Sequence, residues 1–229
     1  MLVAKDIHKK FYEPVLKGVT LQAEAGEIIG IAGKNGSGKS TLLSIIAGLT
    51  APDAGQITLD GEPLVKKRIG YVPQEGTLFE NLSVKDNLRF WASAYSQPWE
   101  NALPMLPQEA SFLKKRAGHL SGGMKKRLAI ALACLHQPKW LLMDEPSAAL
   151  DIGFKGHLSQ MIQDIKAEGR GILFTSHQPD ELMWCDRLYI LNEGVFVYND
   201  DPKKLTGQDL YALTNMGLTD TQIGHNEGR

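Results

Sequence analysis

The sequence predicts an α/β protein built around a mainly parallel sheet, because short apolar runs alternate with helical patterns along the chain. Glycines and prolines separate these runs, and Glu193-Gly194 is typical of a hairpin turn. The length of 229 residues, 43% of them hydrophobic, fits one globular domain. The strands that we expect cover residues 27–31, 56–59, 69–72, 140–143, 171–175, 187–191 and 195–198.

Helical periodicity marks the segment 83–95. Ser83 stands where a helix would begin, and Asp86 follows three residues later, as in a capping box. Apolar residues then recur every three or four positions, as on one face of a helix. This stripe consists of Val84, Leu88, Trp91 and Tyr95. Three prolines between 97 and 116 predict a looser connection after the helix.

Two other helices are expected beside predicted strands. One covers 39–47, between a glycine-rich run and Gly48. The other closes at Gly169 and carries an apolar stripe of the width that covers a sheet. The members of this stripe are Phe154, Leu158, Met161, Ile162 and Ile165.

Charge and hydropathy exclude several functions. The 25 basic and 26 acidic residues leave a net charge of −1, which argues against a nucleic-acid ligand. Three Lys-Lys-Arg triplets, which begin at Lys66, Lys114 and Lys125, are interpreted as solvated faces. The longest apolar run, 128–135, has eight residues, whereas a membrane span needs about 20. The first residues lack the pattern of a secretory signal, so we expect a cytoplasmic chain.

A glycine-rich loop follows the strand expected at 27–31. It contains the pattern GxxxxGK[ST] between an apolar strand and a helix, which is the context of a phosphate-binding P-loop. Backbone amides of such a loop, and those of the helix N-terminus, surround phosphates. Lys39 would reach the β- and γ-phosphates, and Ser40 would ligate Mg²⁺. The predicted nucleotide-binding residues here are Gly33, Lys34, Asn35, Gly36, Ser37, Gly38, Lys39, Ser40 and Thr41.

Two carboxylates follow the strand expected at 140–143. Asp144 ends a buried apolar run, which is the Walker-B arrangement, and it would support the Mg²⁺ that Ser40 ligates. Glu145 comes next, where a water molecule can be polarised toward the γ-phosphate, so it is the candidate general base. An Asp-Glu pair alone usually means solvated charge, but its pairing with a P-loop is specific.

A third segment, Leu120-Ser121-Gly122-Gly123-Met124, opens a predicted helix that runs to Leu135. The Ser121 side chain can cap this helix, and the two glycines leave backbone amides open to an anion. Taken alone, the segment is equally well a flexible turn. Its place after the P-loop and shortly before the Asp-Glu pair favours the phosphate-binding interpretation. With these three motifs the sequence resembles the ATP-binding-cassette (ABC) ATPases.

The resemblance extends to about Leu205. Its most specific part, 120–151, is similar to the family's signature motif, Walker B and D-loop in one run, with the D-loop at Ala148-Ala149-Leu150-Asp151. Met124 departs from the usual glutamine of the signature. The stretch 74–120 is shorter than usual, and the residues after Leu205 match no family regulatory domain.

The resemblance also implies roles for single residues. Gln74, in Tyr71-Val-Pro-Gln74, matches the Q-loop glutamine, which senses Mg²⁺ and the attacking water. His177 matches the switch histidine and, with Gln74, Glu145 and Lys39, completes the implied catalytic set. Phe11 fits the position of the aromatic that stacks on adenine better than Tyr12 does. The residues that would contact ATP bound to a second subunit are Ser121, Gly122 and Gly123.

For the fold, the resemblance implies a P-loop NTPase core with an N-terminal antiparallel β portion and a small helical subdomain. The chain 1–229 would be a single ABC ATPase domain. Residues 1–74 and 136–205 would form the catalytic core, and 75–135 the helical subdomain, which includes the signature helix. Residues 206–229 would form a C-terminal tail.

The implied function is Mg²⁺-dependent ATP hydrolysis in a head-to-tail dimer, formed with itself or with a paralogous ATPase subunit. Because the chain has no membrane span, transport would require an integral membrane transporter subunit, with this chain peripheral at the inner face of the cell membrane. The SGGM signature and the missing regulatory domain favour export weakly. The alternatives are a soluble ABC-type ATPase for assembly or signalling, such as iron–sulfur cluster assembly, and a nucleotide-regulated binding module without turnover.

A partner surface is expected around Leu78, Phe79 and Phe90. Phe90 lies about 120° from the apolar stripe of its helix, so it cannot share the burial of that stripe. Large apolar groups in the turn at 78–79 are costly unless something covers them. The resemblance implies that this region receives a short helix of the membrane subunit. The alternative is that Phe79 and Phe90 pack on each other or under the proline-rich connection.

Overall fold

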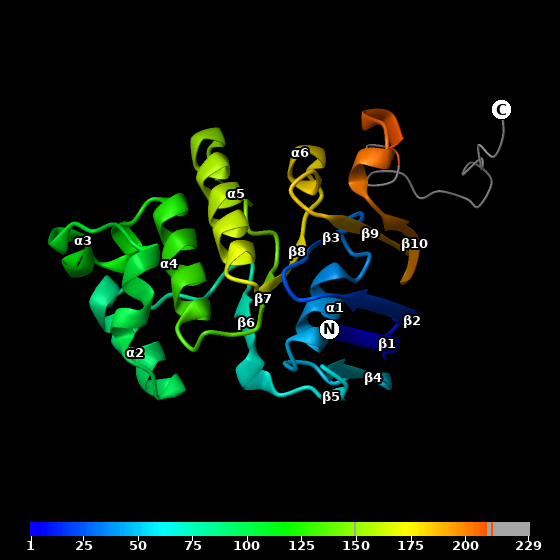
Figure 1. Cartoon of the computed structure of the whole chain (residues 1–229), viewed down its shortest axis with the longest axis horizontal. Helices are drawn as coiled ribbons and strands as arrows, with labels where there is room; N and C mark the ends of the chain where they lie inside the picture. The colour runs from blue at the N-terminus through cyan, green and yellow to red at the C-terminus, as the bar shows by residue number, and fades with distance from the viewer. Residues whose placement is uncertain (149, 210–211, 213–229) are drawn as a thin grey trace.

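The computed structural model of the chain describes residues 1–148, 150–209 and 212, which form an α/β fold with two sheets (Figure 1). In this described part, the larger sheet has six strands in the order β10-β9-β3-β8-β7-β6, parallel except for β10. They are β3 (Ile28–Ala32), β6 (Ile69–Val72), β7 (Trp140–Met143), β8 (Gly171–Thr175), β9 (Arg187–Asn192) and β10 (Val195–Asp200). Six of the seven predicted strands belong to this sheet and lie within two residues of their expected ends, which confirms the mainly parallel sheet.

The N-terminal part forms a second, antiparallel sheet, as expected, in the order β2-β1-β4-β5. Its strands are β1 (Leu2–Lys10), β2 (Pro14–Ala23), β4 (Ala54–Leu59) and β5 (Glu62–Pro63). The sequence pattern predicts only β4 among them. In β1, Asp6 has a φ of 53°, and the buried positions change from Leu2 and Ala4 to Ile7 across it. This irregularity breaks the two-residue alternation by which a strand is identified.

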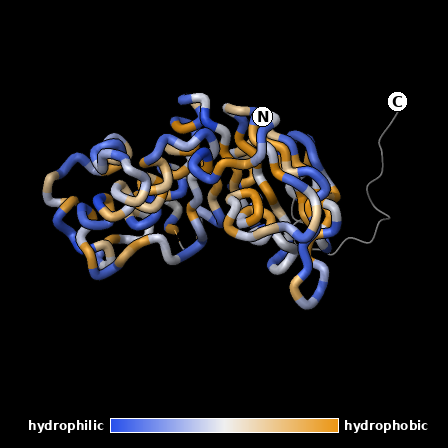
Figure 2. Tube along the Cα trace, turned by 90° about the horizontal axis from the view of Figure 1, so that it is seen from below, coloured by the Kyte–Doolittle hydropathy of each residue, from blue (hydrophilic) through white to orange (hydrophobic). Residues whose placement is uncertain are grey.

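The central strands β3, β7 and β8 are buried on both faces, which explains their continuous apolar sequences. On one face, α1 (Lys39–Ile46) shares a core with the smaller sheet. On the other face lie α4 (Gly122–Cys134) and α5 (Ile152–Ala167). Within β3, Ile29 and Ile31 belong to the first core, and Ile28 and Ala32 to the second. Figure 2 shows hydrophobic stretches running through the interior of this part, with polar stretches outside.

The helical part lies beyond β6 and has a core of its own (Figure 1). It contains α2 (Val84–Tyr95), the 3-10 turns η2 (Trp99–Met105), the short α3 (Ala110–Lys114) and α4. The Ser83 hydroxyl accepts a 3.1 Å hydrogen bond from the Asp86 amide, which confirms the predicted helix start. The connection over 97–116 is irregular, as its prolines predict. The buried core residues are Val84, Leu88, Ala92, Ala102, Leu106, Phe112, Ala117, Leu120, Leu128, Ala131, Leu132 and Leu135.

In the part of the chain that the structure describes, no helix is long and apolar enough to cross a bilayer. Ala149 of the predicted D-loop and most of the predicted tail 206–229 lie outside the described residues. The division into a core of 1–74 and 136–205 and a subdomain of 75–135 stays a prediction. In its support, the buried members of the helical core all fall within residues 84–135.

Candidate nucleotide-binding site

The predicted phosphate-binding loop connects the carboxyl end of β3 to α1. Its backbone requires glycine at two positions. At Gly33, φ is 149° and a Cβ atom would lie 2.3 Å from the Leu191 carbonyl oxygen. Gly38 is the N-cap of α1 in the left-handed conformation, with a φ of 105°, so the helix starts without a capping side chain. The amides of the first turn therefore remain available to an anion.

The Lys39 ammonium lies within the curve of this loop. Its Nζ donates hydrogen bonds to the carbonyl oxygens of Gly33, at 2.9 Å, and Lys34, at 3.2 Å. Burial lowers the pKa of Lys39, and the carboxylates of Glu145 and Asp144 oppose this effect. The Ser37 hydroxyl is buried and has no hydrogen-bond partner among the described residues. A loop that holds a buried cation and a buried hydroxyl without a partner fits a phosphate group.

The ends of β7 and β8 hold the two candidate carboxylates. Because these strands are parallel neighbours, their carboxyl ends meet at one edge of the sheet. Asp144 is buried and accepts a 2.6 Å hydrogen bond from the Thr175 hydroxyl. The same hydroxyl accepts a 2.8 Å hydrogen bond from the Glu145 amide. The hydroxyl of Thr175 thus links the two carboxylate residues and orients both.

The Glu145 carboxylate lies between two polar side chains from neighbouring strand ends. The Gln74 amide Nε2, after β6, is 3.4 Å from one carboxylate oxygen, and His177 Nδ1, after β8, is 3.4 Å from the other. The structure therefore brings together three residues that the resemblance assigns to one site. Glu145 itself adopts a φ of 41°, in the region that favours glycine, and such a conformation is common where a side chain is aimed at a site.

A cavity of about 420 Å³ joins these groups to the P-loop. Phe11 lines this cavity, whereas Tyr12 is almost fully exposed and belongs to no part of its lining. This placement favours Phe11 as the aromatic contact. The other described residues that line the cavity are Val15, Asn35, Gly36, Gly38, Lys39, Ser40, Thr41, Gln74 and Glu145.

The signature segment lies away from this cavity, since none of its described lining residues comes from 121–123. Ser121 is exposed and caps α4, because its hydroxyl accepts a 3.3 Å hydrogen bond from the Met124 amide. A side chain at Gly123 would collide with Phe154, whose ring lies 2.4 Å from an added Cβ. Gly123 therefore allows α4 and α5 to approach closely, a packing role that the sequence pattern does not predict.

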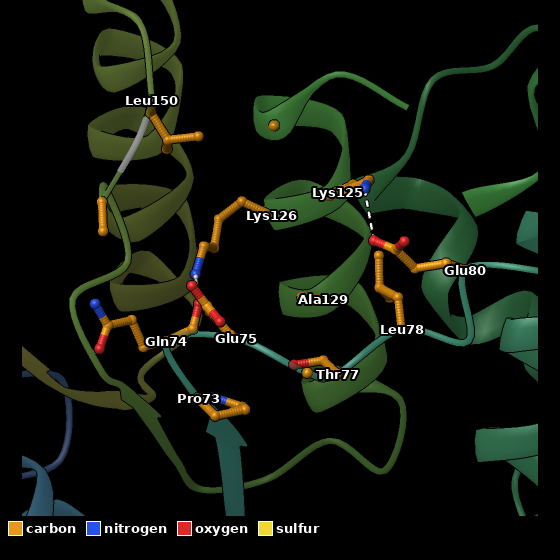
Figure 3. A pocket seen from close by; sticks show the side chains of 13 residues that line it. Pro73, Gln74, Glu75, Thr77, Leu78, Glu80, Lys125, Lys126, Ala129 and Leu150 are labelled. Atoms are coloured by element: carbon orange, nitrogen blue, oxygen red, sulfur yellow. Dashed lines mark hydrogen bonds and ion pairs between the residues drawn. The ribbon is translucent and has the colours of Figure 1, made fainter. Parts of the chain in front are cut away.

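A second cavity, of about 500 Å³, lies between the Q-loop and α4 (Figure 3). Lys126 is buried there, and its Nζ donates a 3.4 Å hydrogen bond to the Gln74 carbonyl oxygen. Burial lowers the pKa of Lys126, while Asp144 and Glu75 act in the opposite direction. The interpretation of the triplet at Lys125 as a solvated face is therefore wrong for Lys126. Arg127 of the same triplet is half-buried, and its Nε donates a hydrogen bond to the Met105 carbonyl oxygen. A charged run does not reveal which of its members face inward.

The oxygen atoms near the P-loop suit a magnesium ion. The Ser40 hydroxyl, the Asp144 carboxylate and the Gln74 amide are hard oxygen donors of the kind that Mg²⁺ prefers. Within residues 1–148, 150–209 and 212, no cluster of three His, Cys, Asp or Glu side chains is arranged to hold a metal. Mg²⁺ commonly binds proteins through one or two side-chain oxygens and completes its coordination with phosphate oxygens and water.

The site has one orienting residue that the motifs do not indicate. Thr175 is fully buried, and its hydroxyl connects the carboxylate of Asp144 with the amide of Glu145. The available signal was a hydroxyl-bearing residue at the end of the strand 171–175, next to the predicted switch histidine. Recognising it requires the order of the strands in the sheet, which places β8 beside β7.

A glycine-rich loop at the end of a central parallel strand, with paired carboxylates on a nearby strand, defines a P-loop nucleotide-binding protein. A family model described as ABC transporter matches residues 16–148, more than half of the chain. The chain therefore belongs to the ABC transporter family, and its fold is that of the ABC ATPase cassette.

Three relatives illustrate the range of transport functions in the family. The chain is 32% identical to the "Linearmycin resistance ATP-binding protein LnrL" of Bacillus subtilis (strain 168), over 96% of this chain and 76% of the relative. It is 34% identical to "Nod factor export ATP-binding protein I" of Rhizobium sp. (strain N33), over 83% of this chain and 67% of the relative. It is 35% identical to "Fe(3+) ions import ATP-binding protein FbpC 2" of Pectobacterium atrosepticum, over 91% of this chain and 65% of the relative.

The fold is also similar to solved cassettes. One is described as the "Dimeric structure of a post-hydrolysis state of the ATP-binding cassette MJ0796 bound to ADP and Pi". The TM-score is 0.78 at 26% sequence identity, and the match covers 88% of this chain and 99% of the other. A second is described as the "Structure of ATP binding subunit of ABC transporter", with a TM-score of 0.78 at 29% identity over 94% and 95%.

Proposed function

We propose that this chain binds MgATP and hydrolyses it by in-line attack of water on the γ-phosphate, as the energy-supplying subunit of an ABC transporter. The observation that carries this proposal is the Glu145 carboxylate, held beside the P-loop cavity between Gln74 and His177. Lys39 and the loop amides would bind phosphate, and Ser40, Asp144 and Gln74 would contact Mg²⁺, which screens phosphate charge when bound. Glu145 would take the proton of the attacking water.

The working unit that we infer is a head-to-tail dimer with ATP between the subunits. The Ser121–Gly123 segment does not line the P-loop cavity of its own chain. The start of α4 at this segment offers backbone amides to an anion. The dimeric solved relative supports this arrangement, since it has the same fold and was captured with ADP and Pi. The second copy would be this chain again or a paralogous ATPase subunit.

The membrane partner that we infer docks on the helical part. Phe79 and Phe90 are 41% and 50% exposed, and their rings contact each other edge to face, with centroids 4.7 Å apart. The two phenylalanine rings are therefore partly exposed to solvent and also packed on each other. An apolar groove of about 610 Å³ lies beside them, with Leu49, Trp91 and Tyr95 in its wall. Such a surface on a chain without a described membrane helix fits a partner at the inner face of the cell membrane.

The signature segment also bears on the direction of transport. We favour export because of the SGGM form of the signature, and the relative named for Nod factor export is consistent with it. The relative named for Fe(3+) import has a similar identity, so the degree of similarity does not separate the two directions. Transport assays with the membrane subunit in oriented vesicles would decide between them.

The test of the proposed chemistry is ATPase activity of the purified chain and of its Glu145→Gln variant. The variant should bind ATP normally, because the side chain contributes little to ground-state phosphate contacts. Its turnover should fall by about 10²–10⁴-fold, as expected on loss of a positioned general base. ATP should then trap a dimer, which size-exclusion chromatography detects. Near-normal turnover in the variant would remove Glu145 from this role.

A further inference from the structure

A fully buried carboxylate, Glu181, lies next to the turn that carries His177, and none of the roles above uses it. Glu181 belongs to α6 (Pro179–Leu182), which follows this turn directly. Its side chain is 0% exposed and accepts a 2.6 Å hydrogen bond from the hydroxyl of Ser176, which is also buried. The Ser176 hydroxyl in turn accepts a 3.0 Å hydrogen bond from the Gln178 amide. The residues on both sides of His177 are therefore fixed to one carboxylate.

The cation that compensates this carboxylate comes from another helix. Lys155 projects from the first turns of α5, and its Nζ lies 3.0 Å from the second oxygen of Glu181. The ammonium also donates to the Gln178 side-chain oxygen and lies 3.8 Å from the exposed Asp180. Figure 1 shows α5 and α6 on the same side of the six-stranded sheet. One ammonium group thus contacts three residues that follow His177.

The start of α5 is itself fixed. Asp151 of the predicted D-loop caps this helix, because its carboxylate accepts a 2.8 Å hydrogen bond from the Phe154 amide. Lys155 is one turn further along the helix. The ion pair between Lys155 and Glu181 therefore joins the D-loop helix to the turn of His177.

His177 has few restraints of its own. Its ring is 46% exposed, and its contact with the Glu145 carboxylate is long, at 3.4 Å. The position of the ring consequently depends on the backbone of residues 176–178. Lys155 neutralises the buried carboxylate of Glu181, and this pair contacts the side chains of Ser176 and Gln178 on either side of His177.

We propose that Lys155 and Glu181 are positioning residues for His177. The ion pair of the half-buried Lys155 with the buried Glu181 holds the turn 176–178 in the conformation that directs the imidazole toward Glu145. This inference rests on the proposed ATPase function for its effect on catalysis. Its structural part, the position of the His177 ring, does not depend on activity.

The test uses the full chain with four variants, and with the first of them combined with the fourth. The double variant Lys155→Met/Glu181→Gln removes both charges and avoids an uncompensated buried carboxylate. Lys155→Arg keeps the cation. Lys166→Met is the matched control, because Lys166 lies on the same helix and pairs at 2.7 Å with the exposed Asp186. His177→Ala provides the background in which positioning no longer matters.

We expect the double variant to lower kcat about 10- to 100-fold while the KM for ATP changes by less than about threefold, because small misplacements act on the reacting geometry. Lys155→Arg and Lys166→Met should retain nearly full kcat. In the His177→Ala background the double substitution should have no further effect. An equal loss of kcat in that background, or a matching rise in KM, would show a merely structural role and overturn the inference.

A second readout is independent of turnover. In the nucleotide-free chain, the NMR resonance of the His177 ring Cε1–H, assigned by its absence in His177→Ala, should shift in the double variant and not in Lys166→Met. An unchanged resonance would contradict the inference. If the wild-type chain hydrolyses no ATP, the proposed function fails, and this spectrum still decides whether the ion pair positions His177.

Discussion

The sheet edge formed by the carboxyl ends of the central strands differs from the helical part in how it holds its functional residues. At the sheet edge, Asp144, Thr175 and Glu145 are joined by hydrogen bonds of 2.6 and 2.8 Å within one chain. In the helical part, the residues of interest lie at the surface. Ser121 is exposed at the start of α4, and Phe90 is half exposed on α2.

This difference separates chemistry from assembly. A network closed within one chain holds its geometry before a substrate arrives, which is the condition for electrostatic catalysis. An exposed serine or phenylalanine gains new contacts only from another molecule. We therefore expect substitutions at the sheet edge to act on the isolated chain, and those on the helical surface to act on its complexes.

The largest effect should come from Gly33→Ala at the P-loop. The added Cβ would lie 2.3 Å from the Leu191 carbonyl oxygen, so the loop must move and its amides lose their arrangement. We expect ATP affinity to fall roughly 100-fold or more, which corresponds to about 3 kcal/mol. Titration with a fluorescent ATP analogue measures this. Gly156→Ala is the control, because an added Cβ at this position of α5 meets no atom within 4 Å, and normal binding by Gly33→Ala would contradict the account.

Ser121→Arg should affect assembly strongly and leave the single chain intact. The arginine would occupy the space of a γ-phosphate bound to the opposing subunit. Monomeric ATP binding should stay near normal, while ATP-driven dimerisation, followed by size-exclusion chromatography, is lost.

Mixing the Ser121→Arg and Lys39→Ala chains sharpens this test. Their heterodimer would have one site with both defects and one with neither, so partial ATPase activity should return. If the Ser121→Arg monomer fails to bind ATP, residues 121–123 serve the P-loop of their own chain. The helical surface would then act in the single chain, as the sheet edge does.

Thr175→Val should affect the activity of the isolated chain because, among the described residues, the Thr175 hydroxyl bonds only to those of the sheet edge. Valine keeps the shape and removes the hydroxyl that donates to Asp144 and accepts from the Glu145 amide. Loss of a hydrogen bond to a charged group costs about 1.5–3 kcal/mol, so we expect kcat/KM for MgATP to fall about 10- to 100-fold. Thr175→Ser, which keeps the hydroxyl, is the control. A similar loss in both variants would assign the effect to packing.

The smallest effect on the isolated chain should come from Phe79→Ser combined with Phe90→Ser. Both side chains are about half exposed, so melting temperature and basal ATPase should change little, whereas coupling to the membrane partner should be lost. Leu88→Ala, in the buried core of the same helix, should cost about 2–5 kcal/mol. A drop of about 10 °C in the double serine variant would place the pair in the core and end the docking proposal.

The central strands were predictable because burial on both faces leaves continuous apolar runs. The predicted segments 69–72, 140–143 and 171–175 agree with β6, β7 and β8 at both ends. In contrast, β1 escaped prediction because the irregularity at Asp6 interrupts its alternation. In β2 the buried residues Leu16 and Val19 are three positions apart across Gly18, which has a φ of 87°, so its alternation is broken as well. Lys126 was misassigned because a charged run gives no sign of which member a neighbouring loop covers.

Local sequence alone determined the P-loop and the starts of α2 and α4, because each depends on residues a few positions apart, such as Ser121 and the Met124 amide. Tertiary structure decided the rest of the site. The Gln74 amide and the Glu145 carboxylate are 71 residues apart in the chain and meet only because β6 pairs with β7. Strand order is set by long-range packing, which the periodicity of a single segment does not encode.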